Sequence, residues 1–195
     1  MTSAAVALWN SEAPAFDEAP DHGLRDPEVR AAWRDLLGGV LPPAPADVVD
    51  LGCGTGTLAL LLAEDGYAVD GLDFSPAMVA LATEKLAGSR ATVRLGDAAD
   101  PGLAPGSVDV VLCRHVLWAL PDPVEVVRRW VAALRPGGRL VLVEGNWSTG
   151  AGLTADRCAE IVGEVCSQVE VRHLPDPALW GREITDERYL LLARP

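Results

Sequence analysis

The sequence predicts an α/β fold, in which one mostly parallel sheet carries helices on both faces. From about residue 46, short apolar runs typical of buried strands alternate with segments of helical character, and this alternation indicates a parallel sheet. The last two apolar runs, 167–174 and 187–193, follow each other with no clear helix between them. They therefore indicate a closing hairpin that contains one antiparallel strand.

The length and charge of the chain limit its function. At 195 residues it suits one domain. The net charge of −12, with no basic run, argues against a nucleic-acid partner. No apolar run approaches the roughly 20 residues of a membrane span, and the N-terminus lacks the pattern of a secretory signal. The four cysteines form no C-x-x-C pair. We therefore expect a cytoplasmic protein, a monomer or homodimer, with no membrane partner and no bound metal.

Residues 1–44 predict a helical N-terminal segment that precedes the domain proper at 45–195. A short helix fits within 3–16, and 25–39 is a stronger candidate. In the second, Asp26 is placed to cap the helix, Pro27 occupies its first position, and Gly38 and Gly39 end it. The proline-rich stretch 42–46 then breaks the chain before the first strand.

The elements of the main fold follow in order. Ser75 and Pro76 mark the start of one helix, and Asp122 with Glu125 forms the pattern of a capping box at another. The expected helices lie at 57–65, 75–88, 122–138 and 154–165. The expected strands lie at 46–52, 67–74, 91–97, 107–115, 138–145, 167–174 and 187–193.

A glycine-rich loop follows the first strand of the main fold. Gly52 and Gly54 match the start of the dinucleotide fingerprint G-x-G-x-x-G, but its sixth position is Thr57, and Gly56 comes one place early. Asp50 precedes the loop, where a carboxylate repels a pyrophosphate and suits a cationic ligand. S-adenosylmethionine, which carries a sulfonium and an ammonium, is such a ligand. The alternative is a tight turn in which Asp50 only caps loop amides.

The next two strands end in further carboxylates. Asp73 is placed to accept the hydroxyls of a ribose, which fits S-adenosylmethionine and NAD equally. Asp97 is placed to accept from an adenine amino group, while the Ala98 amide meets a ring nitrogen. Phe74 and Met78 are candidates to pack on the adenine faces, or else core residues. Together these residues predict an adenosine site.

These segments together resemble the class I S-adenosylmethionine-dependent methyltransferases, in their small-molecule branch. The matching stretches cover about residues 46–145 and are "VVDLGCGTG", "VDGLDFSPAMV", "VRLGDAAD", "VDVVLCRHVLWALPDP" and "LRPGGRLVLVEG". The resemblance implies a Rossmann-like seven-stranded sheet in the order 3-2-1-4-5-7-6. Its strand 7 is antiparallel, helices cover both faces, and an N-terminal helical lid closes the site.

The resemblance also implies roles for particular positions. The glycine loop would contact the methionine part of the cofactor, and Cys113, Arg114 and His115 would lie against its amino acid and sulfonium. Trp9 and Phe16 would belong to the lid and are candidates for substrate binding. Substrate recognition is expected from the N-terminal segment, the end of the strand at 107–115 and the loop 174–184. The chain lacks both the N/D-P-P-Y/F/W tetrad and the acidic metal cluster found in some relatives. A nucleobase or amide acceptor is therefore not expected.

The candidate catalytic residues are histidines. His115 ends a central strand and is the first candidate for a general base, because histidine titrates near neutrality. His22 is the second, whereas His173 lies in a late strand and is expected to be structural. Arg114 is a candidate for binding an acidic substrate or the cofactor carboxylate. We expect an apolar substrate pocket to be lined by Trp118, Asn146, Trp147 and Trp180.

The sequence thus predicts S-adenosylmethionine-dependent methyl transfer to oxygen, nitrogen or carbon of a small molecule, with S-adenosylhomocysteine as product. Two alternatives remain. One is a protein that binds S-adenosylmethionine without methylating, including one that uses the sulfonium for other chemistry. The other is a nicotinamide oxidoreductase, against which the missing third glycine and the missing Y-x-x-x-K pair argue.

Overall fold

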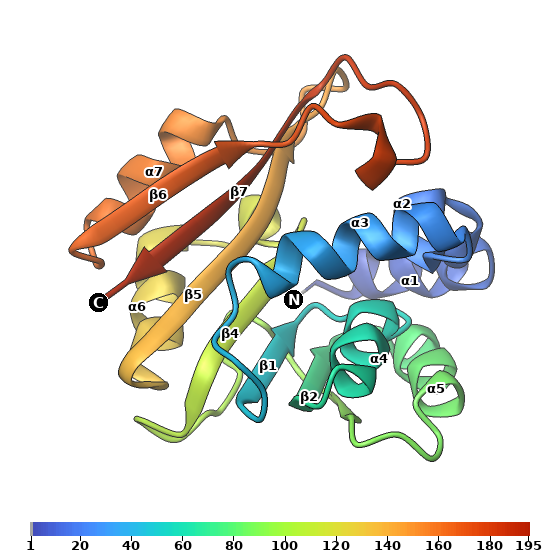
Figure 1. Cartoon of the computed structure of the whole chain (residues 1–195), viewed down its shortest axis with the longest axis horizontal. Coiled ribbons are helices and arrows are strands. Elements are labelled where there is room, and N and C mark those ends of the chain that lie inside the picture. The colour runs from blue at the N-terminus through green and yellow to red at the C-terminus, as the bar shows by residue number, and fades with distance from the viewer. Residues whose placement is uncertain (1) are drawn as a thin grey trace.

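The computed structural model describes residues 2–195 as a single seven-stranded sheet covered by helices (Figure 1). The strand order is β3-β2-β1-β4-β5-β7-β6, as expected. Only β7 runs antiparallel to its neighbours β5 and β6, which confirms the closing hairpin. The strands are β1 (Asp47–Leu51), β2 (Ala68–Asp73), β3 (Thr92–Leu95), β4 (Val108–Arg114), β5 (Leu134–Asn146), β6 (Gln168–His173) and β7 (Glu187–Arg194).

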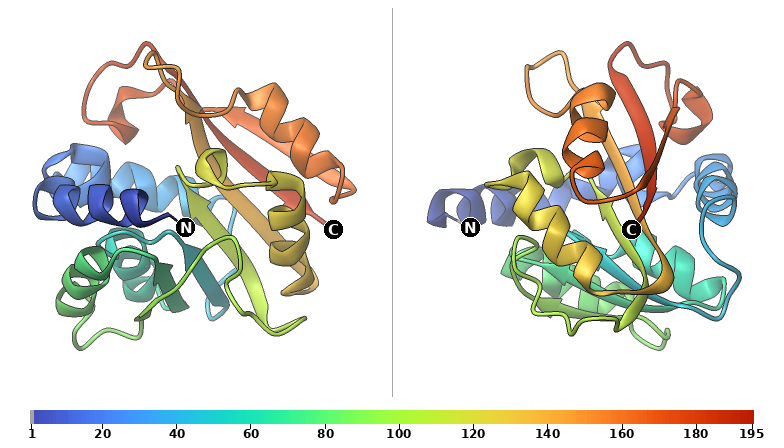
Figure 2. Two further views of the ribbon diagram at one scale, coloured as in Figure 1. Left: turned by 180° about the vertical axis from the view of Figure 1, so that it is seen from behind. Right: turned by 90° about the vertical axis from the view of Figure 1, so that its left-hand side faces the viewer.

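Helices cover both faces of the sheet. The right-hand view of Figure 2 shows α6 and α7 on one side and α3 and α4 on the other. None of the helices within residues 2–195 combines the length and the apolarity that crossing a membrane requires. The α-helices are α1 (Ser3–Glu12), α2 (Pro20–Gly23), α3 (Pro27–Gly38), α4 (Thr57–Glu64), α5 (Pro76–Lys85), α6 (Pro123–Ala132) and α7 (Ala155–Gly163); the short 3-10 helices are η1 (Ala13–Glu18), η2 (Leu117–Ala119) and η3 (Pro177–Leu179).

The expected helix starts are confirmed by side-chain caps. The side chain of Asp26 accepts a hydrogen bond from the first turn of α3, that of Ser75 from α5, and that of Asp122 from α6. Such caps typically contribute about 1 kcal/mol each, because they satisfy amides that have no partner within the helix. The signals that define the helices are therefore local.

The expected helix 122–138 is too long, because α6 ends at Ala132 and the chain enters β5 at Leu134. Pro136 has no amide hydrogen for a helix interior. Leu134 instead pairs with Val108 of β4, and the register shifts before the regular pairing that starts at Val110. The residues 135–138 therefore form an irregularity at the start of β5.

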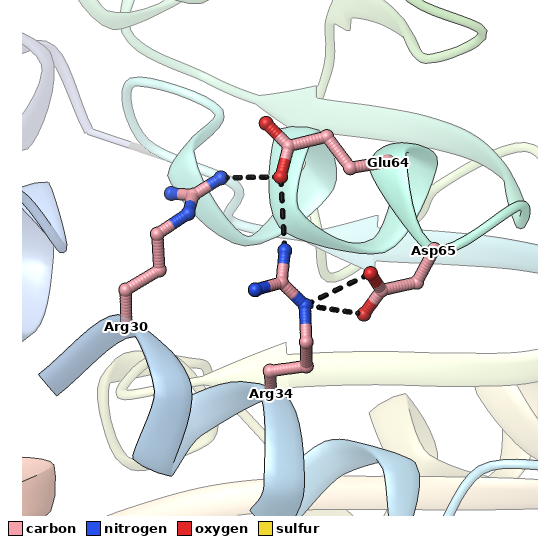
Figure 3. Close-up of polar contacts among 4 residues, drawn as sticks. All are labelled: Arg30, Arg34, Glu64 and Asp65. Carbon is pink, nitrogen blue, oxygen red and sulfur yellow. Dashed lines mark hydrogen bonds and ion pairs between the residues drawn. The ribbon is translucent and has the colours of Figure 1, made fainter. Parts of the chain in front are cut away.

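The first of two cores lies between the sheet and α3, α4 and α5. Trp33 and Leu37 of α3 are fully buried there. On the outside, the guanidinium of Arg34 binds the carboxylates of Glu64 and Asp65, and Arg30 binds Glu64 at 2.7 Å (Figure 3). Half-exposed pairs of this kind contribute at most about 1 kcal/mol each. The buried apolar residues therefore hold α3 in place, and the ion pairs align it with α4.

The second core lies between the sheet and α6 and α7. Trp130 of α6 is fully buried, and its indole nitrogen donates to the carbonyl oxygen of Ala98 at 2.7 Å. This bond fixes the loop that follows β3. Both cores therefore position segments at the carboxyl ends of the parallel strands, where ligands bind in open α/β sheets.

The described part of the N-terminal segment, residues 2–44, divides into two parts. No residue of α1 is buried, whereas α3 shares the first core with the sheet. The part that lies over the carboxyl edge of the sheet is thus α1, η1 and α2, and α3 is a sheet-covering helix. Figure 1 shows α1 and α2 beside α3 at this edge.

Candidate functional site

A cavity of about 620 Å³ opens at the carboxyl edge of the sheet. It runs from the loop after β3, past the ends of β2, β1 and β4, to the segment before β7. The N-terminal segment covers it. Among the residues that line it are most of the expected ones: Trp9, Phe16, His22, Asp50, Gly52, Gly54, Asp73, Phe74, Met78, Asp97, Ala98, Arg114, His115, Trp118, Trp147 and Trp180.

Three expected site residues do not line the cavity. Gly56 caps the start of α4 with φ +78°, and a Cβ there would lie 3.1 Å from the Cβ of Ala82, so its role is to let α4 pack against α5. Cys113 is fully buried in the core on the α6 and α7 side. Asn146 ends β5 opposite Glu187. The spacing of these residues placed them near the site but did not show which way they face.

The glycine loop is held by β2 and by the N-terminal segment. The amides of Gly52 and Cys53 donate to the carbonyl oxygen of Leu72 at 2.7 and 3.0 Å. The Gly54 amide donates to Asp73 Oδ2 at 2.9 Å, and a Cβ on Gly54 would lie 3.1 Å from the Phe16 ring. The backbone of the loop therefore approaches the cavity as closely as only glycine allows.

Asp50 is a buried carboxylate at the centre of the cavity wall. It is 2% exposed, and Oδ2 has no hydrogen-bond partner among residues 2–195. Burial raises its pKa to about 7, although the nearby Arg114 opposes this shift. The loop amides of Gly52 and Gly54 bind other acceptors, so the alternative in which Asp50 only caps them is wrong. Leaving a buried carboxylate oxygen unpaired is costly, and a cation or a donor from a ligand would offset that cost.

The two other carboxylates lie along the adjacent wall. Asp73 Oδ1 accepts from the Ser75 amide at 2.8 Å, and burial raises the pKa of Asp73 against the effect of these hydrogen bonds. Asp97 Oδ1 accepts from the Ala99 amide at 2.9 Å. Each carboxylate oxygen has a second lone pair. Both side chains are therefore oriented by the backbone, and both line the cavity.

His115 lies where β4 turns into the loop before η2. Its φ of +59° is unusual for a residue with a side chain, and its amide donates to the Val143 carbonyl oxygen at 2.9 Å. Its Nε2 is buried without a partner among the described residues. Burial, together with Arg114, His22 and Arg188, holds the pKa of His115 well below its ordinary value. The imidazole is therefore neutral at pH 7.

Glu144, on β5, orders this turn and was not expected from the sequence. Its Oε1 accepts from the amides of Val116 and Leu117 at 3.0 and 2.8 Å, and burial raises its pKa to about 8. The side chain of Val116 occupies the space that a Cβ on Gly52 would need. Glu144 thus links β5, the His115 turn and the glycine loop. A lone carboxylate in the apolar run "LVLVEG" is the signal that could have identified it.

The N-terminal segment is fastened to the cavity rim by polar contacts. Asn10 Oδ1 accepts from Ser75 Oγ at 2.7 Å, and Arg114 Nη1 donates to the Asp21 carbonyl oxygen at 2.5 Å. Phe16 and His22 stack with their ring centroids 4.3 Å apart. Burial, followed by Arg114, lowers the pKa of His22. The segment thus places the Phe16 ring against Gly54 and the His22 ring beside Phe16.

Lys85, the only lysine of the chain, joins this segment to the glycine loop. Its Nζ donates to Asp17 at 2.6 Å, to Thr55 at 2.8 Å and to Thr57 at 2.6 Å. Asp17 also accepts from the Thr55 hydroxyl at 2.5 Å. The end of α5 is therefore tied to η1 and to the start of α4. No sequence motif indicated this contact.

The far end of the cavity is aromatic and contains two arginines that were not singled out from the sequence, although Arg182 lies in the loop 174–184 that was expected to recognise substrate. The rings of His115 and Trp147 meet edge to face at 5.0 Å, and those of His115 and Trp180 lie nearly parallel at 6.3 Å. The guanidinium of Arg188 lies 5.0 Å from the Trp147 ring and 5.5 Å from the Trp180 ring. Arg182 also lines this end. Outside the cavity, His173 lies on β6, beside Glu187 at 3.8 Å.

Comparison with known proteins identifies the family. Residues 49–142 match the family model described as a methyltransferase domain. A ubiquinone biosynthesis O-methyltransferase of Cupriavidus pinatubonensis is 34% identical over 152 residues, which cover 76% of this chain and 59% of the relative. A trans-aconitate 2-methyltransferase of Mycobacterium sp. is 36% identical over 156 residues, which cover 78% of this chain and 56% of the relative. The chain spans less than two thirds of the length of these relatives.

The fold comparison agrees with the sequence comparison. An S-adenosylmethionine-dependent methyltransferase from Mesorhizobium loti superposes with a TM-score of 0.68 at 21% identity, over 85% of this chain and 98% of that one. Fold, sheet order and family match define a Rossmann-like methyltransferase domain. The chain belongs to the class I S-adenosylmethionine-dependent methyltransferases, and the family match decides against a nicotinamide oxidoreductase.

The cavity residues fit the cofactor of this family. The unpartnered Asp50 Oδ2 provides a negative charge for a cationic group. A Cβ on Gly52 would clash with Val116, and a Cβ on Gly54 would lie 3.1 Å from the Phe16 ring, so the loop packs closely against its neighbours. The carboxylates of Asp73 and Asp97 line the cavity and are of the acceptor type that suits hydroxyl and amino groups.

Proposed function

We propose that this protein transfers a methyl group from S-adenosylmethionine to a small molecule. The observation that carries the proposal is that one continuous cavity joins a carboxylate-lined end suited to a cationic nucleoside to an aromatic end that contains His115. The relatives whose names include ubiquinone biosynthesis and trans-aconitate support a small-molecule acceptor.

At the cofactor end, we assign the amino-acid and sulfonium region to Asp50 and the glycine loop. We assign the ribose to Asp73 and the adenine to Asp97 and Ala98. When bound, the cofactor supplies a methyl group that its positive sulfur has already activated. The remaining contribution of the protein is to align the acceptor and exclude water, which accounts for several kcal/mol in oriented reactions.

Exclusion of water is the role that we propose for the lid, residues 2–24. Phe16 lies against Gly54, and Trp9 meets Phe16 edge to face at 6.2 Å. Lys85 and Arg114 hold the segment in place through Asp17 and the Asp21 backbone. Opening these contacts gives ligands access, and closing them removes solvent from the reacting groups.

At the acceptor end, His115 is the residue that we propose to contact the acceptor. Its neutral imidazole has an unpartnered Nε2 that is available for a hydrogen bond. Protonation would place a further cation near Arg114 and Arg188, so His115 is a weak proton acceptor that orients the acceptor more than it ionises it. His22 also lines the cavity, its pKa is also lowered, and it is the second candidate. The apolar wall is assigned to Trp118, Trp147 and Trp180.

The experiment is transfer of a labelled methyl group into small-molecule extracts, with S-adenosylhomocysteine binding measured in parallel. We expect both binding and labelling. Binding of S-adenosylhomocysteine with no labelled product would favour the protein that binds the cofactor without methylating. Equal binding by wild type and Asp73→Ala would show that the ribose assignment is wrong.

His115→Asn tests the acceptor end separately. Because His115 contacts the acceptor and not the adenosine, we expect slower labelling with an unchanged affinity for S-adenosylhomocysteine. If the rate of labelling by His115→Asn stays within about twofold of the wild-type rate between pH 6 and 9, His115 takes no part in the reaction.

A further inference from the structure

The side chain of Arg188 occupies space that a glycine on the neighbouring strand leaves open. It lies opposite Gly145 across the antiparallel pair β5 and β7. A Cβ on Gly145 would lie 2.9 Å from Arg188 Cδ and 3.1 Å from Nη1. Glycine weakens the interior of a strand, so its presence there allows the arginine side chain to lie flat across β5. The side chain is only 7% exposed.

The guanidinium of Arg188 lies against two aromatic rings, and only some of its N–H groups have a hydrogen-bond acceptor. It lies against the faces of Trp147 and Trp180. Its hydrogen bonds are from Nη1 to the Glu187 carbonyl oxygen and from Nη2 to Asp186 Oδ2, both at 3.2 Å. These bonds leave three of the five N–H groups of a guanidinium without an acceptor among the described residues. Since Arg188 lines the cavity, those donors are available to a ligand.

The charges at this end of the cavity do not cancel. Arg182 and Arg188 line it together with one carboxylate, Asp186. Asp186 is shared between Arg188 and the Ser148 amide, which donates to it at 2.7 Å. Arg182 forms no ion pair with another described residue. A local excess of positive charge in a chain of net charge −12 indicates a site for an anion.

The walls beside the arginines are flat and apolar. The ring centroids of Trp147 and Trp118 lie 5.9 Å apart, and Trp118, which also lines the cavity, is 37% exposed. A guanidinium binds a carboxylate through two parallel hydrogen bonds, and the indole faces exclude water from them. On the basis of the proposed function, we propose that the methyl acceptor is a flat, apolar molecule with a carboxylate, which Arg188 binds with support from Arg182.

The test compares carboxylates with their uncharged amides in protein saturated with S-adenosylhomocysteine. The probes are 4-hydroxybenzoate, indole-3-acetate and cinnamate, each paired with its carboxamide, and titration calorimetry gives the dissociation constants. We expect at least one carboxylate to bind about tenfold or more tightly than its amide, because a hydrogen bond to a charged group contributes roughly 1.5–3 kcal/mol.

Two variants and a matched control locate the effect. Arg188→Met should abolish the preference for the carboxylate, and Arg182→Gln should reduce it severalfold. Arg157→Met, which removes an exposed arginine of α7 paired with Glu160, should leave it unchanged. Retained binding of S-adenosylhomocysteine shows that each variant is folded.

Two outcomes would overturn the proposal: no carboxylate of the panel binds more tightly than its amide, or the preference survives in Arg188→Met. If the wild-type protein does not bind S-adenosylhomocysteine, the proposed function itself is refuted. Failure of the carboxylate proposal and failure of the proposed function are therefore distinguishable.

Discussion

The ionisation of Asp50 predicts a pH dependence of cofactor binding. In the free protein, burial raises the pKa of Asp50 to about 7, so the carboxyl is protonated in mildly acidic solution. A cationic ligand beside Oδ2 stabilises the anion and lowers this pKa. Binding below pH 7 therefore requires the release of a proton, whereas binding above pH 7 does not.

The size of the effect follows from this linkage. As the pH falls from about 8 to about 6, the dissociation constant of S-adenosylmethionine should rise roughly tenfold. Asp50→Asn should bind roughly 10 to 100 times more weakly at pH 8, since it loses a charged partner. It should also lose the pH dependence between these values.

The assay is titration calorimetry at pH 6, 7 and 8, with proton release measured from the buffer dependence of the enthalpy. 5′-Methylthioadenosine is the control ligand, because it retains the adenosine but lacks the sulfonium and the ammonium. It meets Asp73, whose pKa burial also raises, but not the charge of Asp50. An affinity of the wild type for S-adenosylmethionine that is constant over this range would refute the reasoning. So would an equal slope for the control ligand or for Asp50→Asn.

Three further predictions concern the frame of the site. In urea unfolding, Gly56→Ala should lower the free energy of unfolding by roughly 2–4 kcal/mol, because it adds left-handed backbone strain and a clash with α5. The control Gly88→Ala, at φ +80° with no close neighbour, should lower it by only about 1–2 kcal/mol. Equal losses in the two variants would exclude the clash. Folding raises the pKa of Glu144 from 4.5 to about 8, so Glu144 keeps its proton to a higher pH in the native state than in the unfolded chain. As the pH rises between these two pKa values, the free energy of unfolding therefore falls by at most about 1.4 kcal/mol per pH unit. Glu144→Gln should remove this slope in urea unfolding at pH 5, 6.5 and 8, and an unchanged slope would assign it to other groups. Lys85→Met should speed the release of S-adenosylhomocysteine roughly tenfold in stopped-flow displacement, and an unchanged rate would show that the Asp17 contact does not hold the lid.

The fold was predictable because its signals are local. Asp26, Ser75 and Asp122 mark helix starts through bonds to residues two or three positions away. Apolar runs likewise indicate buried strands one at a time. The end of α6 was misjudged in two respects: the local signal of Pro136 was not used, and the pairing of Leu134 with Val108 is a contact with a distant strand that no local pattern encodes.

The cofactor end of the cavity was also anticipated, since parallel strands bring their carboxyl ends to one edge. Asp50, Asp73 and Asp97 follow directly from this rule and line the cavity. The acceptor end was anticipated only in part. Arg188 becomes visible only once β7 pairs with β5 and places its side chain across Gly145.

The contact of Lys85 with the N-terminal segment gives the protein a chemical reporter. Lys85 carries the only side-chain amine of the chain, and that amine is engaged by three acceptors while η1 is in place. An amine-directed reagent therefore has a single side-chain target, which becomes reactive only when the segment lifts. The rate of acylation of one residue would then measure how often the cavity opens, without a spectroscopic label and without knowledge of the methyl acceptor.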